Sequence, residues 1–157
     1  MEAATMQPRA TNPFMAVPGA FDAVMTLAKA ARRTGLAPAT AKMTHLRASQ
    51  INGCGYCVEM HSREMREAGE PPERIAAVAA WRDAPYFDPA ERAALALTEA
   101  VTRMADRPDS VPDALWEDIT EHYDEQAVAG LLLEIGVINL WNHVNVPTRQ
   151  VAGSGPS

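Results

Sequence analysis

The two cysteines of this 157-residue chain lie three residues apart, as Cys54-Gly-Tyr-Cys57, and His61 follows four residues after the second. On a helix these three positions fall within about 60° of one another, so both sulfurs and the imidazole share one face. A thiolate at the start of a helix is stabilised by free backbone N–H groups and by the helix dipole. A second sulfur nearby can trap an oxidised first sulfur as a disulfide before over-oxidation. The pattern predicts thiol redox chemistry at Cys54 and Cys57, with His61 placed to move a proton.

Zinc binding is the main competing interpretation of the same residues. Cys54, Cys57 and His61 supply three ligands, and His45 could supply a fourth. Structural zinc usually draws its ligands from separate elements, whereas three of these four would come from one helix. We therefore expect no bound metal. A small buried thiol and a core histidine are the non-catalytic interpretation of the individual residues.

Composition indicates a single globular domain. The chain is 47% hydrophobic, which is enough to form a packed core without disulfide or metal cross-links. No apolar run approaches the roughly 18 residues of a membrane span, and residues 1–10 lack the apolar stretch of a secretory signal. We therefore expect a cytoplasmic protein with no membrane partner. In that compartment a lone Cys-x-x-Cys pair favours a redox or metal role over a structural disulfide.

The charge pattern argues against nucleic acid as a partner. The formal net charge is −6, and acidic and basic residues are interspersed along the chain. A protein that follows a phosphate backbone usually carries a basic block, and this sequence has none.

The elements that must hold the cysteines are predicted to be helices. Apolar residues recur three and four positions apart, and no alternating strand pattern of useful length is present. The predicted fold is all-α, a single-domain bundle of about six to seven helices over residues 19–146, with an N-terminal arm at 1–18 and a flexible C-terminal tail at 147–157. The expected helices are 20–34, 39–51, 54–68, 71–81, 88–104, 110–122 and 124–144.

Two local signals set the helix boundaries most clearly. Asn52-Gly53 interrupts the helical pattern just before Cys54, which puts both sulfurs in the first turn of the next helix. Asp88-Pro-Ala-Glu91 has the spacing of a capping box, with proline at the first helical position.

The segment from His45 to His61, HLRASQINGCGYCVEMH, resembles the core of the alkylhydroperoxidase D-like, carboxymuconolactone decarboxylase family. The resemblance covers roughly residues 8–146. It includes the stretches Ala79–Phe87, Glu91–Leu97 and Ile138–Asn142. It implies an all-helical fold that assembles into trimers or larger homo-oligomers.

The same resemblance implies a thiol-dependent peroxidase. Cys57 would be the peroxidatic sulfur, Cys54 the resolving and more accessible sulfur, and His61 part of the proton relay. The substrate would be a small-molecule peroxide. Reduction in the family is associated with dithiol donors such as a lipoyl-bearing protein, and no metal, haem or flavin cofactor is expected.

One position departs from the family pattern. The family relay usually includes a glutamate twelve residues before the first cysteine, where this chain has Lys42. A cation cannot act as that base, although it could favour a nearby thiolate through its charge. His45 on the same predicted helix and Glu134 on the last one are candidate substitutes. The structural interpretation of His45 is a packed or exposed helix histidine. That of Glu134 is a carboxylate that is solvated or paired elsewhere.

Two further functions fit the same scaffold. A lactone-acid decarboxylase is suggested by the family's second name, but that reaction does not need a dithiol. The second is a non-catalytic redox-sensing or binding module, in which Lys42 marks a lapsed relay.

Several polar and aromatic residues could border the site. Tyr56, between the cysteines, could line an entry path or pack against another subunit. The polar cluster of Asn139, Asn142 and His143 near the end of the last helix could border a pocket or make capping and interfacial hydrogen bonds.

Overall fold

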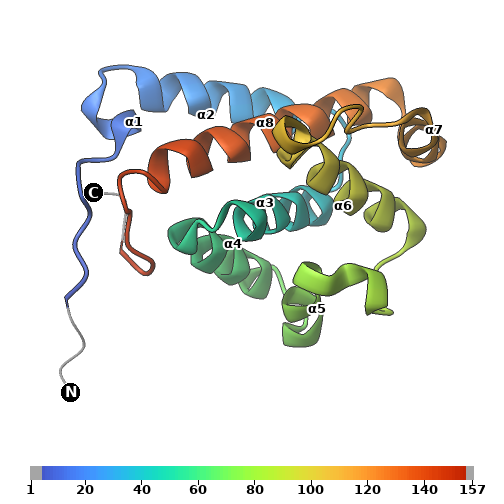
Figure 1. Cartoon of the computed structure of the whole chain (residues 1–157), viewed down its shortest axis with the longest axis horizontal. Coiled ribbons are helices and arrows are strands. Elements are labelled where there is room, and N and C mark those ends of the chain that lie inside the picture. Colours follow the sequence, from blue (N-terminus) through green and yellow to red (C-terminus); the bar gives the residue numbers. More distant parts are fainter. Residues whose placement is uncertain (1–4, 155–157) are drawn as a thin grey trace.

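Helices form almost all of the regular structure in the computed structural model, which describes residues 5–154 (Figure 1). No strand occurs in this range, and the predicted all-α class is confirmed. The helices are α1 (Pro13–Ala16), α2 (Ala20–Ala31), α3 (Pro38–Asn52), α4 (Gly55–Glu67), α5 (Pro72–Ala77), α6 (Pro89–Thr102), α7 (Asp113–His122) and α8 (Glu125–Asn145). Two 3-10 segments, η1 (Val78–Asp83) and η2 (Met104–Asp106), follow α5 and α6.

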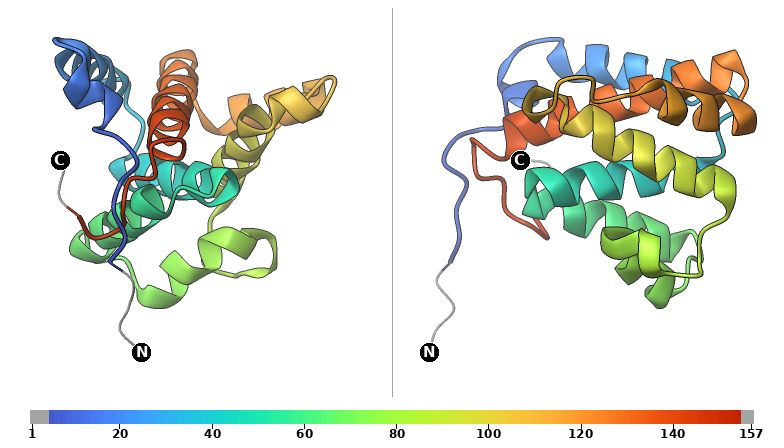
Figure 2. Two further views of the ribbon diagram at one scale, coloured as in Figure 1. Left: turned by 60° about the vertical axis from the view of Figure 1, so that its left-hand side comes forward. Right: turned by 45° about the vertical axis from the view of Figure 1, so that its right-hand side comes forward.

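Helices α3 and α8 form the centre of the bundle (Figures 1 and 2). Helix α3 packs against α4, α6 and α8, and α8 also packs against α2. The central position of α3 explains its sequence, because a helix with neighbours on several sides does not need a continuous polar face. Its buried side chains include Met43, Leu46 and His45.

Within residues 5–154, the buried apolar side chains form three clusters. One lies between α3, α6 and α8 around Leu97, Leu131 and Ile135. A second joins α3 and α4 to α5 and η1 around Leu46 and Met65. The third fastens α1 and α2 to α8. Its buried members are Phe14, Val24, Ala28 and Val137. Each large side chain buried in this way contributes about 1.5–3 kcal/mol relative to exposure.

The corner between α3 and α4 places the cysteines. Gly53 ends α3 with φ 68°, a left-handed conformation that glycine adopts without steric cost. The Cys54 N–H then donates to the Ser49 carbonyl at 3.0 Å. Cys54 becomes the N-cap of α4 and Cys57 its third residue. The prediction that both sulfurs lie at a helix start is confirmed.

The capping box before α6 is also confirmed. The Asp88 carboxylate accepts from the Glu91 N–H at 2.8 Å, and the Glu91 carboxylate accepts from the Asp88 N–H at 3.0 Å. These two bonds satisfy backbone donors that a helix start otherwise leaves free. The start of α6 could therefore be located from the sequence.

Two predicted helices have different limits in the structure. The helix expected over 71–81 is divided: α5 ends at Ala77, η1 follows it, and within η1 Ala80 leaves the helical region (φ −133°, ψ 43°). The Arg92 guanidinium donates there to the carbonyls of Trp81 at 3.1 Å and Ala84 at 3.0 Å. The helix expected from residue 110 begins at Asp113, because the residue before Pro112 is disfavoured in helical geometry.

The N-terminal arm contains one helical turn, α1, that was not predicted from the sequence. Asn12 caps it by accepting from the Phe14 N–H at 3.0 Å, and Pro13 takes the first helical position. The Phe14 ring lies 4.2 Å from the Trp141 ring, measured between centroids. Asn followed by Pro is a helix-start signal, and this contact on α8 makes so short a helix stable.

Helix α8 is long and apolar enough, by length and composition alone, to cross a membrane. Half of its apolar window is buried inside the bundle. It also carries the buried polar residues Glu134, Asn142 and Asn145, each hydrogen-bonded within the protein. These contacts are those of the core helix of a globular fold.

Candidate active site

Cys54 and Cys57 are joined by a disulfide, with their Cα atoms 5.3 Å apart. The Cys-x-x-Cys spacing at the helix start therefore brings both sulfurs within bonding distance. Both residues are buried, with 2% of Cys54 and none of Cys57 exposed. The family resemblance implies that Cys54 is more accessible than Cys57, but in the single chain the two differ by only this small exposed fraction.

The start of α4 supplies a donor to one of the two sulfurs. The Cys57 backbone N–H donates to Cys54 Sγ at 3.3 Å, so this sulfur serves as the N-cap acceptor of the helix. A helix start also carries partial positive charge. Both effects favour negative charge on Cys54 Sγ once the disulfide is reduced.

Cys57 forms part of the wall of a cavity of about 350 Å³. The cavity lies between α1, α2, α4 and α8, and much of its wall is apolar. Its apolar and aromatic side chains include Met15, Phe21, Met25, Tyr56, Met60, Ile138 and Trp141. Cys54 is not part of this wall in the described residues. Of the two cysteines, Cys57 is therefore the one that borders the cavity, and Tyr56 borders it as well.

His61 lies one turn after Cys57 on α4 and lines the same cavity. Its Nδ1 is 2.9 Å from Glu64 Oε2, whereas its Nε2 is buried and has no hydrogen-bond partner in residues 5–154. Burial lowers the pKa of His61 below 6.5, and the hydrogen bond with Glu64 only partly offsets this. The imidazole is therefore neutral at pH 7 and can accept a proton.

Glu64 is the hydrogen-bond partner of His61 Nδ1, and its side chain is more exposed than that of His61. The hydrogen bond from His61 holds the pKa of the Glu64 carboxyl below its usual value, with a smaller contribution from the charge of Lys42. An ionised carboxylate on Nδ1 fixes the proton of the neutral imidazole on that nitrogen. Nε2 is then the basic nitrogen.

His45 and Glu134 form a second buried pair beside His61. His45 Nε2 lies 2.5 Å from Glu134 Oε2, and the His45 and His61 ring centroids are 5.0 Å apart. Glu134 is 1% exposed, and its Oε1 has no hydrogen-bond partner among the described residues. Both residues line the cavity that reaches Cys57. The fold thus brings these two predicted candidates together with His61.

Lys42 does not line the cavity at Cys57 in the described residues. It lines a second hollow of about 480 Å³, which shares Arg32, His45, Glu64 and Glu134 with the cavity at Cys57. The position that carries the family glutamate therefore holds a cation facing a separate space.

Asn145 is a site residue that was not singled out from the sequence. Its Nδ2 donates to Cys57 Sγ at 3.4 Å, and it lines the cavity. Spacing could have indicated it, because Glu134, Ile138, Trp141 and Asn145 form one stripe of α8 and all line the cavity.

The asparagines of the polar cluster near the end of α8 make hydrogen bonds between helices. Asn52 Nδ2 donates to the side-chain oxygens of Asn139 and Asn142, both at 2.9 Å, and Asn142 Nδ2 donates to Ser49 Oγ at 3.1 Å. His143 is exposed. The asparagines therefore hold the end of α3 against α8, next to the turn that carries Cys54.

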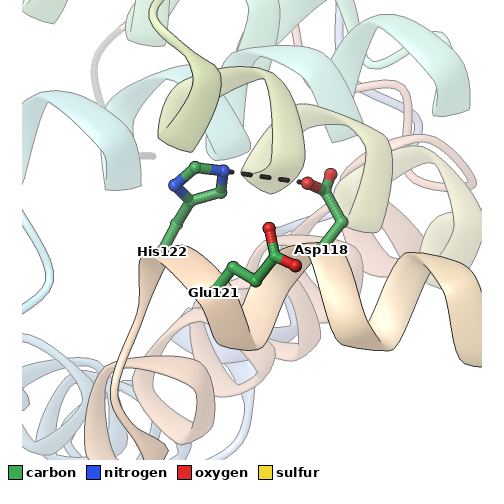
Figure 3. Close-up of side chains that lie close together, drawn as sticks. All are labelled: Asp118, Glu121 and His122. Carbon is green, nitrogen blue, oxygen red and sulfur yellow. Dashed lines mark ion pairs between the residues drawn. The ribbon is translucent and has the colours of Figure 1, made fainter.

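A group of possible metal ligands lies on α7, where Asp118, Glu121 and His122 face one another (Figure 3). All three are exposed, and His122 Nε2 is 3.7 Å from Asp118 Oδ1. Helix α7 supplies none of the described residues of the cavity wall. This spacing is that of a solvated helix face.

Comparison with known proteins places the chain in a family. The sequence pattern of the carboxymuconolactone decarboxylase family matches residues 18–100. The uncharacterized protein YdfG of Bacillus subtilis (strain 168) is 34% identical over 137 residues, which is 87% of this chain and 92% of that protein. The uncharacterized protein YnjA of Escherichia coli (strain K12) is 34% identical over 109 residues, covering 69% of this chain and 58% of YnjA. The chain belongs to the carboxymuconolactone decarboxylase family.

Solved structures share the fold. The protein ATU0492 of Agrobacterium tumefaciens, of unknown function and suggested to be the antioxidant defence protein AhpD, superposes with a TM-score of 0.86 at 34% identity. The match covers 95% of this chain and all of ATU0492. The debrominase Bmp8 has a TM-score of 0.75 at 20% identity, over 88% of this chain and 74% of Bmp8. The likeness to ATU0492 supports the alkylhydroperoxidase D-like fold expected from the sequence.

Proposed function

We propose that this protein is a thiol-dependent peroxidase in which Cys57 and Cys54 pass through a dithiol–disulfide cycle. The observation that carries the proposal is the position of Cys57. Its sulfur is bonded to a partner sulfur, forms part of an apolar cavity wall, and lies one helical turn from a neutral buried histidine. These features support a cycle in which Cys54 resolves, the cavity admits the oxidant and His61 serves as the base.

The first step is attack of the Cys57 thiolate on the distal oxygen of a small-molecule peroxide. The O–O bond breaks, Cys57 becomes a sulfenic acid, and the leaving alkoxide takes a proton to give an alcohol. His61 accepts the proton of the Cys57 thiol and returns it to the leaving oxygen. The unpartnered Nε2 of His61 suits this role.

The second step joins the two sulfurs. The Cys54 thiol loses its proton, its thiolate attacks the Cys57 sulfenic sulfur, the S–O bond breaks as the disulfide forms, and the departing hydroxide takes up that proton to give water. The N-cap hydrogen bond to Cys54 Sγ supports this thiolate. A dithiol then reduces the disulfide through a mixed disulfide and is itself oxidised. A lipoyl-bearing protein is the donor class that the family suggests.

Glu134 and His45 take the place of the family's relay glutamate in this proposal. Their 2.5 Å pair lies beside His61 and offers a buried carboxylate from α8, whereas Lys42 faces the second hollow. Glu134 then orients His45 and stabilises positive charge on the two imidazoles while the proton is held.

We further propose that the protein acts in the cytoplasm as a homo-oligomer, a trimer or larger. Apolar side chains exposed on α2 and α8 support association. They are Phe21, Leu27, Leu133 and Leu140, each about two fifths exposed. Light scattering during size-exclusion chromatography measures the assembly, and a monomer at micromolar concentration would contradict this part of the proposal.

Steady-state turnover tests the peroxidase. With cumene hydroperoxide and dihydrolipoamide, the wild-type protein should consume many equivalents of peroxide, and Cys57→Ser should consume none above background. Cys54→Ser is the matched variant, in which Cys57 should react once and over-oxidise. Wild-type rates from Cys57→Ser would refute the proposal. A single oxidation without turnover would identify a redox sensor instead.

The wild-type protein and its cysteine variants also distinguish the peroxidase from the decarboxylase and from a zinc-binding protein. A lactone-acid decarboxylase should keep its activity in the Cys54→Ser, Cys57→Ser double variant, because that chemistry needs no dithiol. Zinc at Cys54, Cys57, His61 and His45 would require both sulfurs as thiolates. Metal analysis of the reduced protein measures the amount of bound zinc directly.

A further inference from the structure

Two asparagines from opposite ends of the chain form a hydrogen-bonded path to Cys57. Asn12, before α1, donates from Nδ2 to Asn145 Oδ1 at 2.8 Å. Asn145, the last residue of α8, donates from Nδ2 to Cys57 Sγ at 3.4 Å. Both asparagines are buried, with 8% and 2% of their surface exposed, and both line the cavity. The steps of the proposed peroxide cycle use neither of them.

The backbone fixes which way each amide group points. Asn12 Oδ1 accepts from the Phe14 N–H at 3.0 Å, and a backbone N–H can only donate. The other end of the Asn12 amide must therefore be its NH₂ group, which requires the oxygen of Asn145 as the acceptor. The Asn145 group that faces Cys57 is then necessarily an N–H donor.

We propose that Asn145 stabilises the thiolate of Cys57, and that Asn12 is the positioning residue that keeps the Asn145 donor turned toward the sulfur. The N-terminal arm thereby becomes part of the redox site. The inference rests on the proposed function only in taking Cys57 as the reacting sulfur. A hydrogen bond to a charged acceptor is stronger than one to a neutral acceptor, so the donor favours the thiolate over the thiol.

The donor also acts when the disulfide is reduced. A thiolate of the reductant bonds to Cys54 Sγ, the Cys54–Cys57 bond breaks, and the electron pair of that bond goes to Cys57 Sγ. Asn145 is already hydrogen-bonded to this sulfur in the disulfide form, so the leaving thiolate is stabilised without any rearrangement.

Residues 9–10 are hydrogen-bonded to residues 148–150 where this path begins. The Arg9 N–H donates to the Thr148 carbonyl at 2.8 Å, and Gln150 Nε2 donates to the Ala10 carbonyl at 3.1 Å. The Gln150 N–H donates to the Asn145 carbonyl at 3.1 Å. These bonds keep the segment before Asn12 beside the end of α8, and so hold the two amide groups in contact.

Alkylation of Cys57 by iodoacetamide, followed from pH 5 to pH 10, tests the inference. All proteins carry Cys54→Ser so that one thiol reacts. Asn145→Leu removes the donor at similar volume and should lower the alkylation rate at pH 7 about tenfold, with the rise in rate moved to higher pH. Asn12→Ser keeps a helix cap but cannot reach Asn145, and should lower the rate about threefold.

Asn139→Leu is the matched control. Asn139 is another hydrogen-bonded asparagine of α8, it does not line the cavity in the described structure, and its substitution should leave the alkylation profile unchanged. A folded Asn145→Leu protein with the unaltered rate and pH dependence would overturn the inference, as would an equal fall in Asn139→Leu. If Asn145→Leu does not fold, an unaltered profile in Asn12→Ser overturns it.

The outcomes separate this inference from the peroxidase proposal. Alkylation needs no peroxide, so a shifted profile in a protein without peroxidase turnover would support the inference and refute the proposed function. Normal alkylation in Asn145→Leu, together with loss of turnover in Cys57→Ser, would refute the inference and support the proposed function.

Discussion

Two of the polar clusters in this bundle differ in how fully their atoms are hydrogen-bonded. In the Glu99 cluster, formed by Glu99, Arg47, Trp81 and Arg82, both carboxylate oxygens have donors. Glu99 Oε1 accepts from Arg47 Nε and Trp81 Nε1, both at 2.9 Å, and Oε2 accepts from Arg82 Nη1 at 2.7 Å. In the histidine cluster, formed by His45, His61, Glu64 and Glu134, His61 Nε2 and Glu134 Oε1 have no partner among the described residues.

The electrostatics of the two clusters follow the same division. Burial alone would raise the pKa of Glu99, but hydrogen bonds from Arg82, Trp81 and Arg47 outweigh it and leave the pKa below its usual value. Burial dominates at His61 and lowers its pKa, so the ring stays neutral. A saturated cluster holds one charge state firmly, whereas a cluster with free buried atoms has capacity to exchange a proton.

An unpartnered buried polar atom costs about 1–3 kcal/mol, so its presence in a folded protein requires an explanation. Among residues 5–154, two of the three buried side-chain atoms without a hydrogen-bond partner, His61 Nε2 and Glu134 Oε1, belong to the histidine cluster, next to the cavity that reaches Cys57. The third, Arg74 Nε, lies 2.7 Å from Glu70 Oε2 in an ion pair. We therefore interpret the Glu99 cluster as structural and the histidine cluster as chemical. Substitutions in the two clusters should affect different measured quantities.

Loss of the base at His61 should have the largest effect. His61→Gln keeps a polar side chain but has no group that accepts a proton near pH 7, and kcat/KM for peroxide should fall about a hundredfold. Steady-state kinetics between pH 5.5 and 8 measures this. Turnover within twofold of the wild type at every pH would mean that His61 moves no proton.

Replacement of Glu99 should change stability and leave catalysis intact. Glu99→Gln removes the charge and turns one acceptor into a donor facing Arg or Trp N–H groups, so the free energy of unfolding should fall by about 2 kcal/mol. Urea denaturation measures the loss. Turnover at saturating peroxide should match that of the wild type, and a large fall in turnover would remove the distinction between the clusters.

The same substitution at Glu134 should have the opposite pattern. Glu134→Gln preserves shape and can still bond His45, but it removes the buried negative charge beside the two imidazoles. Turnover should fall about tenfold, which corresponds to about 1.4 kcal/mol. The free energy of unfolding should be unchanged or slightly higher, because a buried carboxylate with one unpartnered oxygen is replaced by a neutral amide. A loss of stability equal to that of Glu99→Gln would assign Glu134 to a structural role.

The pH dependence of stability should be the smallest effect. Because the pKa of His61 is below 6.5 in the folded chain, the unfolded chain binds a proton that the folded chain does not, and stability falls as the pH drops below about 6.5. Glu64, with a lowered pKa, contributes stability above about pH 4.5 that is lost on further acidification.

Urea denaturation at pH 7.5, 6.0 and 5.0 measures this dependence in wild type and His61→Gln. The wild type should lose more stability than the variant over this range. An equal loss in both proteins would contradict the burial of a neutral imidazole at position 61.

The sequence was sufficient to predict features that depend on neighbouring residues. Gly53 before Cys54 indicated a helix end followed at once by a helix start, and Asp88 with Glu91 indicated a capping box, because these signals act within one turn. The kink at Ala80 was not predictable in the same way. The segment that follows it is bonded by Arg92 of the next helix, through the carbonyls of Trp81 and Ala84, and no pattern within 71–81 indicates these contacts.

The site required contacts between distant parts of the chain. His45 and Glu134 were both candidates, but their pairing depends on the packing of α3 on α8 across 89 residues. Asn12 and Asn145 are 133 residues apart, and their contact depends on where the N-terminal arm lies. No local pattern specifies such a register, although the cavity-facing stripe of α8 could have indicated Asn145.

The central claim is that peroxide oxidises Cys57 and that Cys54 then closes the disulfide. Intact-protein mass spectrometry of the fully reduced protein, before and after one equivalent of cumene hydroperoxide, tests it most directly. The wild type should lose two hydrogens, whereas Cys54→Ser should gain oxygen at Cys57. An unchanged mass of the reduced wild-type protein after peroxide treatment would contradict the claim.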